Sequence, residues 1–435
     1  MLCLLLAGFS AIAQRSRGYN ESIDLKLDRF DGRYAKGETV SVTAEYAPGF
    51  TGNVVVNVIQ NGKKASAEVV KAVSGTVFSA SYDAPTLVYV NVAPENSPKD
   101  MTSVGFIVDA EGFEPGFPYP RDMKKFWKKQ IKALRSVPMV SSAKPVAIHE
   151  KGADGYECFE IRVNSIDSIP CSGYLVRPVN AVKKSLPIVM FLHGAGVAGP
   201  SKRSSIKTAL RYARMGGGAI ALDLNAHGMD NDRPQSYYDS LETGPLKDYS
   251  KRAVTDHESF YFRSMFLRTV RALDYLVKDP AWDGKRVMVF GSSQGGAQSA
   301  AIAGLDKRVG AAVLLVPAMM DMGGELAGHN KAWFYTMGKQ PESASEIVPY
   351  YDGANLIRNF KGKLWVEAGL IDSTCPASCV FSGYNKALKC SEKHILTYPY
   401  RPHPEPEGRY REAWVEKVQT ARLDFINSYL APKGK

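Results

Sequence analysis

The larger, C-terminal part of the chain alternates short apolar runs with longer amphipathic segments, and this alternation limits the fold more than any other feature. The apolar runs lie at 187–192, 219–222, 286–290, 311–316, 363–368 and 394–398. A strand that is apolar on both sides must be covered on both faces. Helical spacing of apolar residues marks the segments between or after these runs, at 205–215, 258–278, 297–303, 376–388 and 411–429. The pattern predicts an α/β fold with a mostly parallel sheet covered by helices.

A different pattern precedes this region. Residues 20–110 contain short β-branched runs such as 39–44 and 54–58, which are bounded by turn signals including Asn61-Gly62. Strands that recur at this spacing are typical of a small antiparallel β-sandwich of the immunoglobulin type. Residues 111–120 hold three prolines and two glycines, and each proline removes a backbone donor. We therefore expect a β-sandwich domain at 20–110, a linker at 111–120 and an α/β domain at 121–431.

The first residues predict export. Leu2 to Ala13 are apolar except for Ser10, and Ala11-Ile12-Ala13 has the small residues of a signal-peptide cleavage site. We expect a signal peptide at 1–13 and a periplasmic or extracellular mature protein. Beyond this segment, no stretch has the 18 or so apolar residues that a membrane span needs. The sequence therefore predicts no membrane span.

Composition excludes several classes of protein. Hydrophobic residues make up 45% of the chain and charged residues 23%, as in ordinary globular proteins. The net charge of +11 comes without a dense lysine and arginine run among aromatics, so we expect no nucleic-acid partner, although the basic balance favours anionic partners in general. Cys375 and Cys379 lack the spacing of a zinc site. We expect no metal, and the five cysteines after Cys3 to be buried thiols with at most one bridge.

One motif predicts chemistry. Gly291-Ser292-Ser293-Gln294-Gly295 matches the Gly-x-Ser-x-Gly nucleophile elbow, directly after the buried run 286–290 and before a helix of small residues. A serine on such a strand-to-helix turn projects above the edge of the sheet, and the flanking glycines let the turn pack closely. A turn without chemistry would carry the same letters, but its place after a central strand favours catalysis. We therefore predict Ser293 as the nucleophile.

A serine nucleophile needs a base and an acid that orients the base. On an α/β-hydrolase fold the order along the chain is serine, then acid, then histidine. Asp372 follows the run 363–368, and His403 follows the run 394–398, so both lie on loops at the edge where such sheets bind ligands. We predict a catalytic triad of Ser293, Asp372 and His403. His394 begins its strand, too far from the elbow to act as the base.

The oxyanion of the reaction needs two N–H donors. We predict the amides of Gln294, which follows the nucleophile, and of Ala195, in the loop His193-Gly194-Ala195-Gly196 after the run 187–192. Other polar residues near these loops are expected to have structural roles or to line the site, and they are His193, Asp223, His227 and Glu367. The proposed chemistry requires neither a metal nor an organic cofactor.

Four segments resemble a known family, the acetyl xylan esterases and cephalosporin deacetylases of carbohydrate esterase family 7. They are Phe117-Pro118-Tyr119-Pro120 with Phe126-Trp127, Tyr261-Phe262-Arg263 with Val270-Arg271-Ala272-Leu273, Gly291–Gly296, and Gly369-Leu370-Ile371-Asp372 with Cys375-Pro376. The likeness covers roughly residues 117–430. It implies an α/β-hydrolase fold and places the family's nucleophile, acid and base on Ser293, Asp372 and His403. The chain departs from the family at Ala195, where a tyrosine is usual, and at Pro404, because the base is usually followed closely by a glutamate.

These observations predict an exported serine esterase that removes acetyl groups from xylan or other acetylated plant saccharides. Alternatives on the same fold are a glucuronoyl methylesterase and a peptidase. A carbohydrate-binding protein with an inert hydrolase domain is the alternative from another class. Family members often form ring-shaped hexamers, and an added N-terminal domain could block this, so a homo-oligomer stays an open expectation. The N-terminal domain is expected to pack against the catalytic domain rather than to bind glycan.

Overall fold

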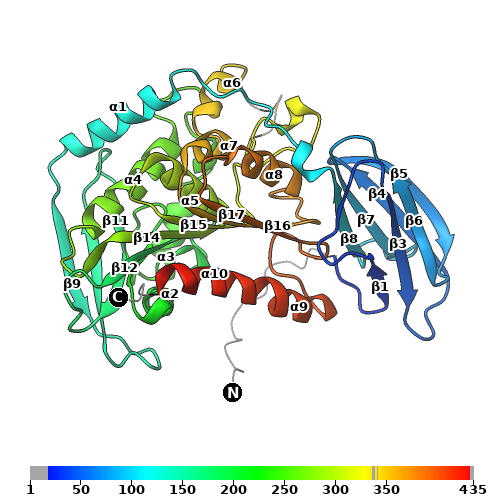
Figure 1. Cartoon of the computed structure of the whole chain (residues 1–435), viewed down its shortest axis with the longest axis horizontal. Coiled ribbons are helices and arrows are strands. Elements are labelled where there is room, and N and C mark those ends of the chain that lie inside the picture. The colour runs from blue at the N-terminus through cyan, green and yellow to red at the C-terminus, as the bar shows by residue number, and fades with distance from the viewer. Residues whose placement is uncertain (1–17, 336–338, 340, 432–435) are drawn as a thin grey trace.

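The computed structural model describes residues 18–335, 339 and 341–431. Figure 1 shows an all-β region, in blue, beside a larger region in which helices flank a long sheet. The predicted signal peptide at 1–13 and Cys3 lie outside the described residues. No helix within the described ranges is long and apolar enough to cross a membrane.

The all-β region contains two sheets. One sheet has the order β1-β3-β6, and the other has the order β2-β8-β7-β4-β5. Their bounds are β1 Ile23–Lys26, β2 Arg33–Tyr34, β3 Thr39–Tyr46, β4 Asn53–Gln60, β5 Lys63–Lys71, β6 Gly75–Ser81, β7 Thr86–Pro94 and β8 Thr102–Val108. Alternate residues of β3 and β4 are buried, including Val40, Val42 and Val56, so the two sheets enclose a common core. This agrees with the predicted antiparallel β-sandwich.

A nine-stranded sheet forms the centre of the larger region, with the order β17-β16-β15-β14-β12-β13-β11-β10-β9. The bounds are β9 Ser141–Val146, β10 Tyr156–Val163, β11 Cys171–Pro178, β12 Leu186–Leu192, β13 Ile220–Leu224, β14 Trp282–Ser292, β15 Ala311–Leu315, β16 Lys363–Gly369 and β17 Glu392–Tyr398. Neighbours from β13 to β17 pair in parallel, whereas β9, β10 and β11 are antiparallel. The predicted mostly parallel sheet is therefore present, and an antiparallel hairpin of β10 and β11 extends it.

Helices cover both faces of this sheet (Figure 1). One face packs with α1, α4, α5 and α8, and the other with α2 and α10. The main helices are α1 Met123–Ser136, α2 Ile206–Ala213, α3 Gln235–Thr243, α4 Tyr261–Leu276, α5 Gln294–Leu305, α8 Ala377–Lys386, α9 Arg409–Trp414 and α10 Thr420–Leu430, with the short α6 Ala344–Ile347 and α7 Gly353–Leu356. The predicted α/β-hydrolase architecture is thus confirmed.

The structure departs from the prediction in local details. The single closing helix expected at 411–429 is divided by a π-helical turn at Val415–Gln419. Asp223, expected after its strand, lies within β13. The five cysteines of the described residues are all free thiols, so the bridge that the sequence left open does not form among them.

Candidate active site

The nucleophile elbow is built by close packing of glycines. β14 ends at Ser292, α5 begins at Gln294, and Ser293 between them has φ 56° and ψ −122°. A Cβ on Gly291 would lie 2.2 Å from the backbone of Gly295, and a Cβ on Gly295 would lie 1.9 Å from the carbonyl oxygen of Leu192. Both contacts are far below van der Waals distance, so only glycine fits. The turn is therefore pressed against the end of β12, and Ser293 keeps a strained conformation.

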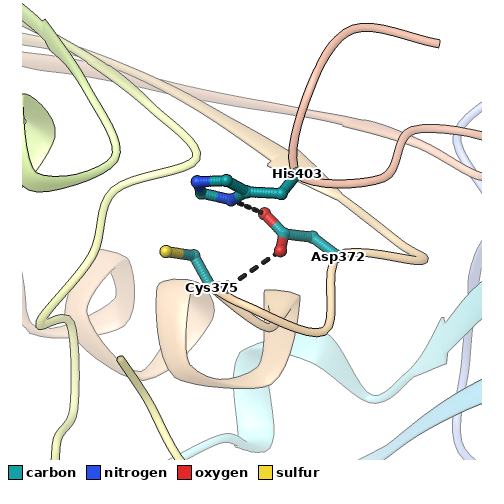
Figure 2. Close-up of side chains that lie close together, drawn as sticks. All are labelled: Asp372, Cys375 and His403. Atoms are coloured by element: carbon teal, nitrogen blue, oxygen red, sulfur yellow. Dashed lines mark hydrogen bonds and ion pairs between the residues drawn. The ribbon is translucent and has the colours of Figure 1, made fainter. Parts of the chain in front are cut away.

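Two loops bring the predicted acid and base to Ser293. Nε2 of His403 lies 3.0 Å from Oγ of Ser293, and Nδ1 of His403 lies 2.8 Å from Oδ2 of Asp372. Figure 2 shows the imidazole beside the carboxylate. Asp372 is fully buried, whereas the His403 side chain is 28% exposed. The three side chains thus form one continuous hydrogen-bonded chain with its histidine open to solvent.

Asp372 is held by more than the histidine. Its Oδ1 accepts hydrogen bonds of 2.8 Å from the amides of Thr374 and Cys375, in the turn that precedes α8. Because these two backbone donors hold Oδ1, the turn orients the Asp372 side chain with Oδ2 toward His403. The arrangement is the one that a base-orienting acid needs.

Asp372, Cys375 and His403 are also the one group in the described part of the chain whose side-chain atoms lie close enough to hold a metal ion, within 4.8 Å of one another (Figure 2). The atoms of these residues that could bind a metal ion already make hydrogen bonds. Nδ1 of His403 and both oxygens of Asp372 make the hydrogen bonds above. Burial, with the Asp372 charge beside it, raises the pKa of the Cys375 thiol well above its usual range, and the thiol contacts the Ser293 side chain by a hydrogen bond. The donor set therefore fits a hydrogen-bonded triad better than a metal site.

The loops of the acid and the base are tied to each other. The amide of Ile371 donates to the carbonyl of Arg401 at 3.3 Å. The Arg401 guanidinium pairs with the fully buried Glu367 of β16, which also pairs with Arg422 of α10 at 2.9 Å. Pairing with two arginines offsets the free-energy cost of burying the Glu367 carboxylate. Glu367 thus lies outside the triad, as predicted, and anchors the loop that carries His403.

The loop after β12, which contains Ala195, passes beside the elbow. A Cβ on Gly194 would lie 3.7 Å from Cβ of Ser293, so the loop passes along the nucleophile. No described residue accepts a hydrogen bond from the amide of Ala195 or of Gln294. Both amides are thus unpaired among the described residues, as the predicted role in an oxyanion hole requires.

Buried histidines hold this loop from behind, as the sequence predicts. Nε2 of His193 lies 2.5 Å from Oδ1 of Asp223, and Nε2 of His227 lies 3.2 Å from the carbonyl of Gly196. Burial, with the Arg268 charge beside it, lowers the pKa of His227 to about 3, so this ring is neutral near pH 7. His227 and His193 are therefore bracing groups and do not reach the triad.

The all-β region contacts the acid and base loops directly. The phenol of Tyr89, in β7, donates a hydrogen bond of 2.9 Å to the backbone carbonyl of Asp372. The amide of Gly105, in β8, donates to the carbonyl of Pro399 at 2.9 Å, and a Cβ on Gly105 would lie 2.0 Å from the carbonyl oxygen of Leu370. The expectation that this region packs against the catalytic region agrees with these contacts, which fall on the loops of Asp372 and His403.

Sequence reasoning missed three residues near the site. Tyr89 reads as one more aromatic of a buried strand. Tyr249, the first residue of the 3₁₀ turn Tyr249–Lys251, donates a hydrogen bond of 2.5 Å to Oε1 of Gln294 and accepts one from the amide of Gly196 at 3.4 Å. Cys375 was expected only as a buried thiol. The Asp372-x-x-Cys375 spacing was the one available signal, because a residue three positions after an acid can lie in the same turn.

Comparison with known proteins gives a consistent result. A family model described as acetyl xylan esterase (AXE1) matches residues 109–419. An acetyl esterase of Xylanibacter ruminicola, Axe7A, is 31% identical over 324 residues, which are 70% of each chain. Solved acetyl xylan esterases from Paenibacillus sp. R4 and Thermoanaerobacterium sp. JW/SL YS485 share 24% and 22% identity, with TM-scores of 0.60 and 0.57. Each alignment covers 74% of this chain and 98% of the solved chain, so the solved structures share the fold of about three quarters of this chain.

Proposed function

The chain belongs to the acetyl xylan esterase family and is a carboxylic-ester hydrolase, and from this premise we propose that it removes acetyl groups from xylan or another acetylated plant saccharide by a Ser-His-Asp mechanism. The observation that carries the proposal is the hydrogen-bonded chain from Ser293 through His403 to Asp372 at the elbow. An acetylated saccharide is the proposed substrate because it fits the acetyl xylan esterase family.

In the first half of the proposed reaction, Oγ of Ser293 attacks the acetyl carbonyl while Nε2 of His403 takes its proton. Asp372 stabilises the imidazolium through Nδ1. The developing oxyanion is bound by the amides of Ala195 and Gln294. The saccharide hydroxyl then leaves with the proton from His403, and an acetyl-enzyme remains.

In the second half, His403 activates a water molecule, which attacks the acetyl-enzyme through the same oxyanion site. Acetate leaves, and Ser293 regains its proton from His403. His403 carries each proton that is transferred in this cycle, and its side chain is partly exposed to water. The cycle calls on no metal or organic cofactor.

A panel of substrates tests the reaction. We expect acetyl esters, including acetylated xylo-oligosaccharides, to be cleaved far faster than esters of about eight carbons, because extra methylenes overpack a small acyl pocket. Methyl glucuronate esters and peptides test the alternative activities. Covalent labelling of Ser293 by a fluorophosphonate probe tests whether the site is reactive at all. Faster cleavage of the long acyl chain, of methyl esters or of peptides would overturn the acetyl-esterase proposal.

We also propose that the mature protein is exported, to the periplasm or beyond the cell. The apolar segment 2–13 and the small residues before Gln14 support cleavage after Ala13. Fractionation of the producing cells and N-terminal sequencing of the isolated protein test this directly. A cytoplasmic protein that keeps Leu2 to Ala13 would contradict it.

A further inference from the structure

One lysine lies against the loop that carries the oxyanion donors. Lys202 ends a short 3₁₀ turn at Pro200–Lys202, which follows this loop. Its stem covers Gly196: Cγ, Cδ and Cε lie 3.0, 3.4 and 3.4 Å from the place where a Cβ of Gly196 would be. Its Nζ lies 3.6 Å from the corresponding place on Gly194, and Cβ of Ser293 lies 3.7 Å from that same place. The ammonium and the nucleophile therefore border the same space.

This ammonium has no counter-ion among the described residues, because none of their carboxylates lies within 4.0 Å of it. Acidic groups of the neighbourhood are engaged elsewhere. Asp223 binds His193 and the amide of Ser205, and Glu242 accepts from the amides of Val197 and Ala198. Lys202 is half-buried, and burial lowers its pKa. A half-buried ammonium without a partner is costly, and a ligand that supplies a negative charge offsets this cost.

We propose that Lys202 binds a carboxylate of the substrate, so that the preferred esters are acetyl groups on acidic saccharides, with a uronic acid close to the acetylated sugar. This inference rests on the proposed function and names the substrate class of the same site. In the proposed reaction the amides of Ala195 and Gln294 bind the oxyanion, so the ammonium of Lys202 is left to bind a group beside the reacting ester. The net charge of +11 also favours an acidic substrate, because it attracts acidic polysaccharides to the protein.

The role of Lys202 is one of specificity, and a matched pair of substrates measures it. Acetylated xylo-oligosaccharides with and without a neighbouring uronic acid are compared by kcat/KM. We expect the wild-type enzyme to prefer the acidic substrate by about 10- to 100-fold, the value of one hydrogen bond to a charged group in a partly buried site. Because an ion pair open to solvent is screened, the preference decreases as salt is raised.

Three variants identify the source of the preference. Lys202→Met keeps the length of the stem over Gly196 and removes the charge, so it should lose the preference, measured as the ratio of kcat/KM on the acidic substrate to kcat/KM on the neutral one. Lys202→Arg keeps the charge and should retain most of the preference. Lys207→Met, which removes an exposed lysine of α2, should behave as wild type. Equal loss on both substrates in Lys202→Met, or no preference in the wild type, would overturn the proposal.

A binding measurement separates this inference from the proposed reaction. In a Ser293→Ala background, an acidic xylo-oligosaccharide should bind about 10-fold or more weakly when Lys202→Met is added, whatever the reaction of the enzyme is. Calorimetric titration gives this difference without turnover. If the wild type cleaves no acetyl ester but the binding difference remains, the proposed function fails and the carboxylate site stands. If acetyl esters are cleaved and the binding difference is absent, the carboxylate site fails alone.

Discussion

The two halves of the candidate active site are supported in different ways. Ser293 and the loop of Ala195 are held inside the catalytic region, where Gly295 packs on the carbonyl of Leu192 at the end of β12. The loops of Asp372 and His403 are held partly from outside, by Tyr89 and Gly105 of the all-β region. The nucleophile half thus depends on its own sheet, and the acid–base half depends on a second body of the protein.

This difference decides which supports a sequence can reveal. The contacts of the elbow follow from a motif of adjacent residues, Gly291 to Gly296, on a strand and helix that the pattern predicts. The bond between Tyr89 and Asp372 joins residues 283 positions apart. No sequence pattern in either segment indicates this hydrogen bond. A tyrosine in a buried strand fits the same sequence pattern whether its side chain faces the core of its own domain or another domain. Four mutational and chemical experiments test the comparison.

The largest effect is expected at the nucleophile half. Ser293→Ala should lower kcat by roughly 10³-fold or more, since no other group can form the acyl-enzyme. Ser292→Ala is the matched control and should keep most activity, because Ser292 ends β14 and does not project from the turn. Single-turnover and steady-state rates on an acetyl ester measure both. A larger loss in Ser292→Ala than in Ser293→Ala would mean that the elbow register is wrong.

A similar loss is expected at the base of the acid–base half. His403→Ala should abolish turnover, because Nε2 of His403 is the basic nitrogen that lies 3.0 Å from Ser293 Oγ. His394→Ala is the control. That side chain is 45% exposed and pairs with Glu392 at 2.8 Å, so its loss should leave kcat/KM unchanged. Activity in purified His403→Ala would remove this histidine from the mechanism.

Much of the fold could be predicted because the buried parts of parallel strands are continuous apolar runs, as in β12, β15 and residues 287–290 of β14. The elements that escaped prediction lack this signal. β9 is an edge strand with the sequence Ser-Ser-Ala-Lys-Pro-Val, and most of its residues are exposed. α3 buries only Tyr238. The helical spacing of apolar residues is not interrupted at the π turn Val415–Gln419, so the sequence pattern does not predict this turn.

For the site, chain order and loop position were enough to choose Ser293, Asp372 and His403 as candidates, and the structure brings the three side chains together. Those signals are local, because each residue follows an apolar strand. The contributions of Tyr89, Tyr249 and Lys202 depend on contacts between segments that are distant in the sequence. No local motif in a single sequence indicates such contacts. Their roles emerge only from the packed structure.

A smaller effect is expected where the all-β region meets the acid loop. Tyr89→Phe removes one buried hydrogen bond to the backbone of Asp372, a loss of about 1 kcal/mol. If that energy aligns Asp372 for catalysis, kcat should fall by up to about fivefold with KM unchanged. Tyr429→Phe is the matched control. It removes a half-buried phenol that accepts a hydrogen bond from the amide of Val287 in β14 and donates one to its carbonyl, away from the acid and base loops, and should lower the melting temperature without lowering kcat.

The two variants together test the comparison between the halves. Equal losses of stability with a lower kcat in Tyr89→Phe alone would confirm that the all-β region supports the acid–base half. If kcat stays at the wild-type value in both variants, the contact between the two regions contributes to stability and not to catalysis. The two halves of the site would then not differ in how their catalytic residues are supported. Thermal unfolding followed by circular dichroism and steady-state kinetics on one acetyl ester supply both readouts.

The smallest effect is expected at Cys375, where the two halves touch. Burial and the Asp372 charge raise the pKa of this thiol well above its usual range, so it stays protonated and unreactive between pH 7 and 8.5. Native enzyme treated with iodoacetamide in this interval should therefore keep its activity, and half-buried Cys390 should be alkylated first. Peptide mass mapping follows each cysteine, and denatured enzyme, in which all thiols react, is the control. Rapid labelling of Cys375 with loss of activity would mean that the turn carrying Asp372 separates from Ser293 in solution, and the support from the all-β region would then be too weak to hold the acid–base half closed.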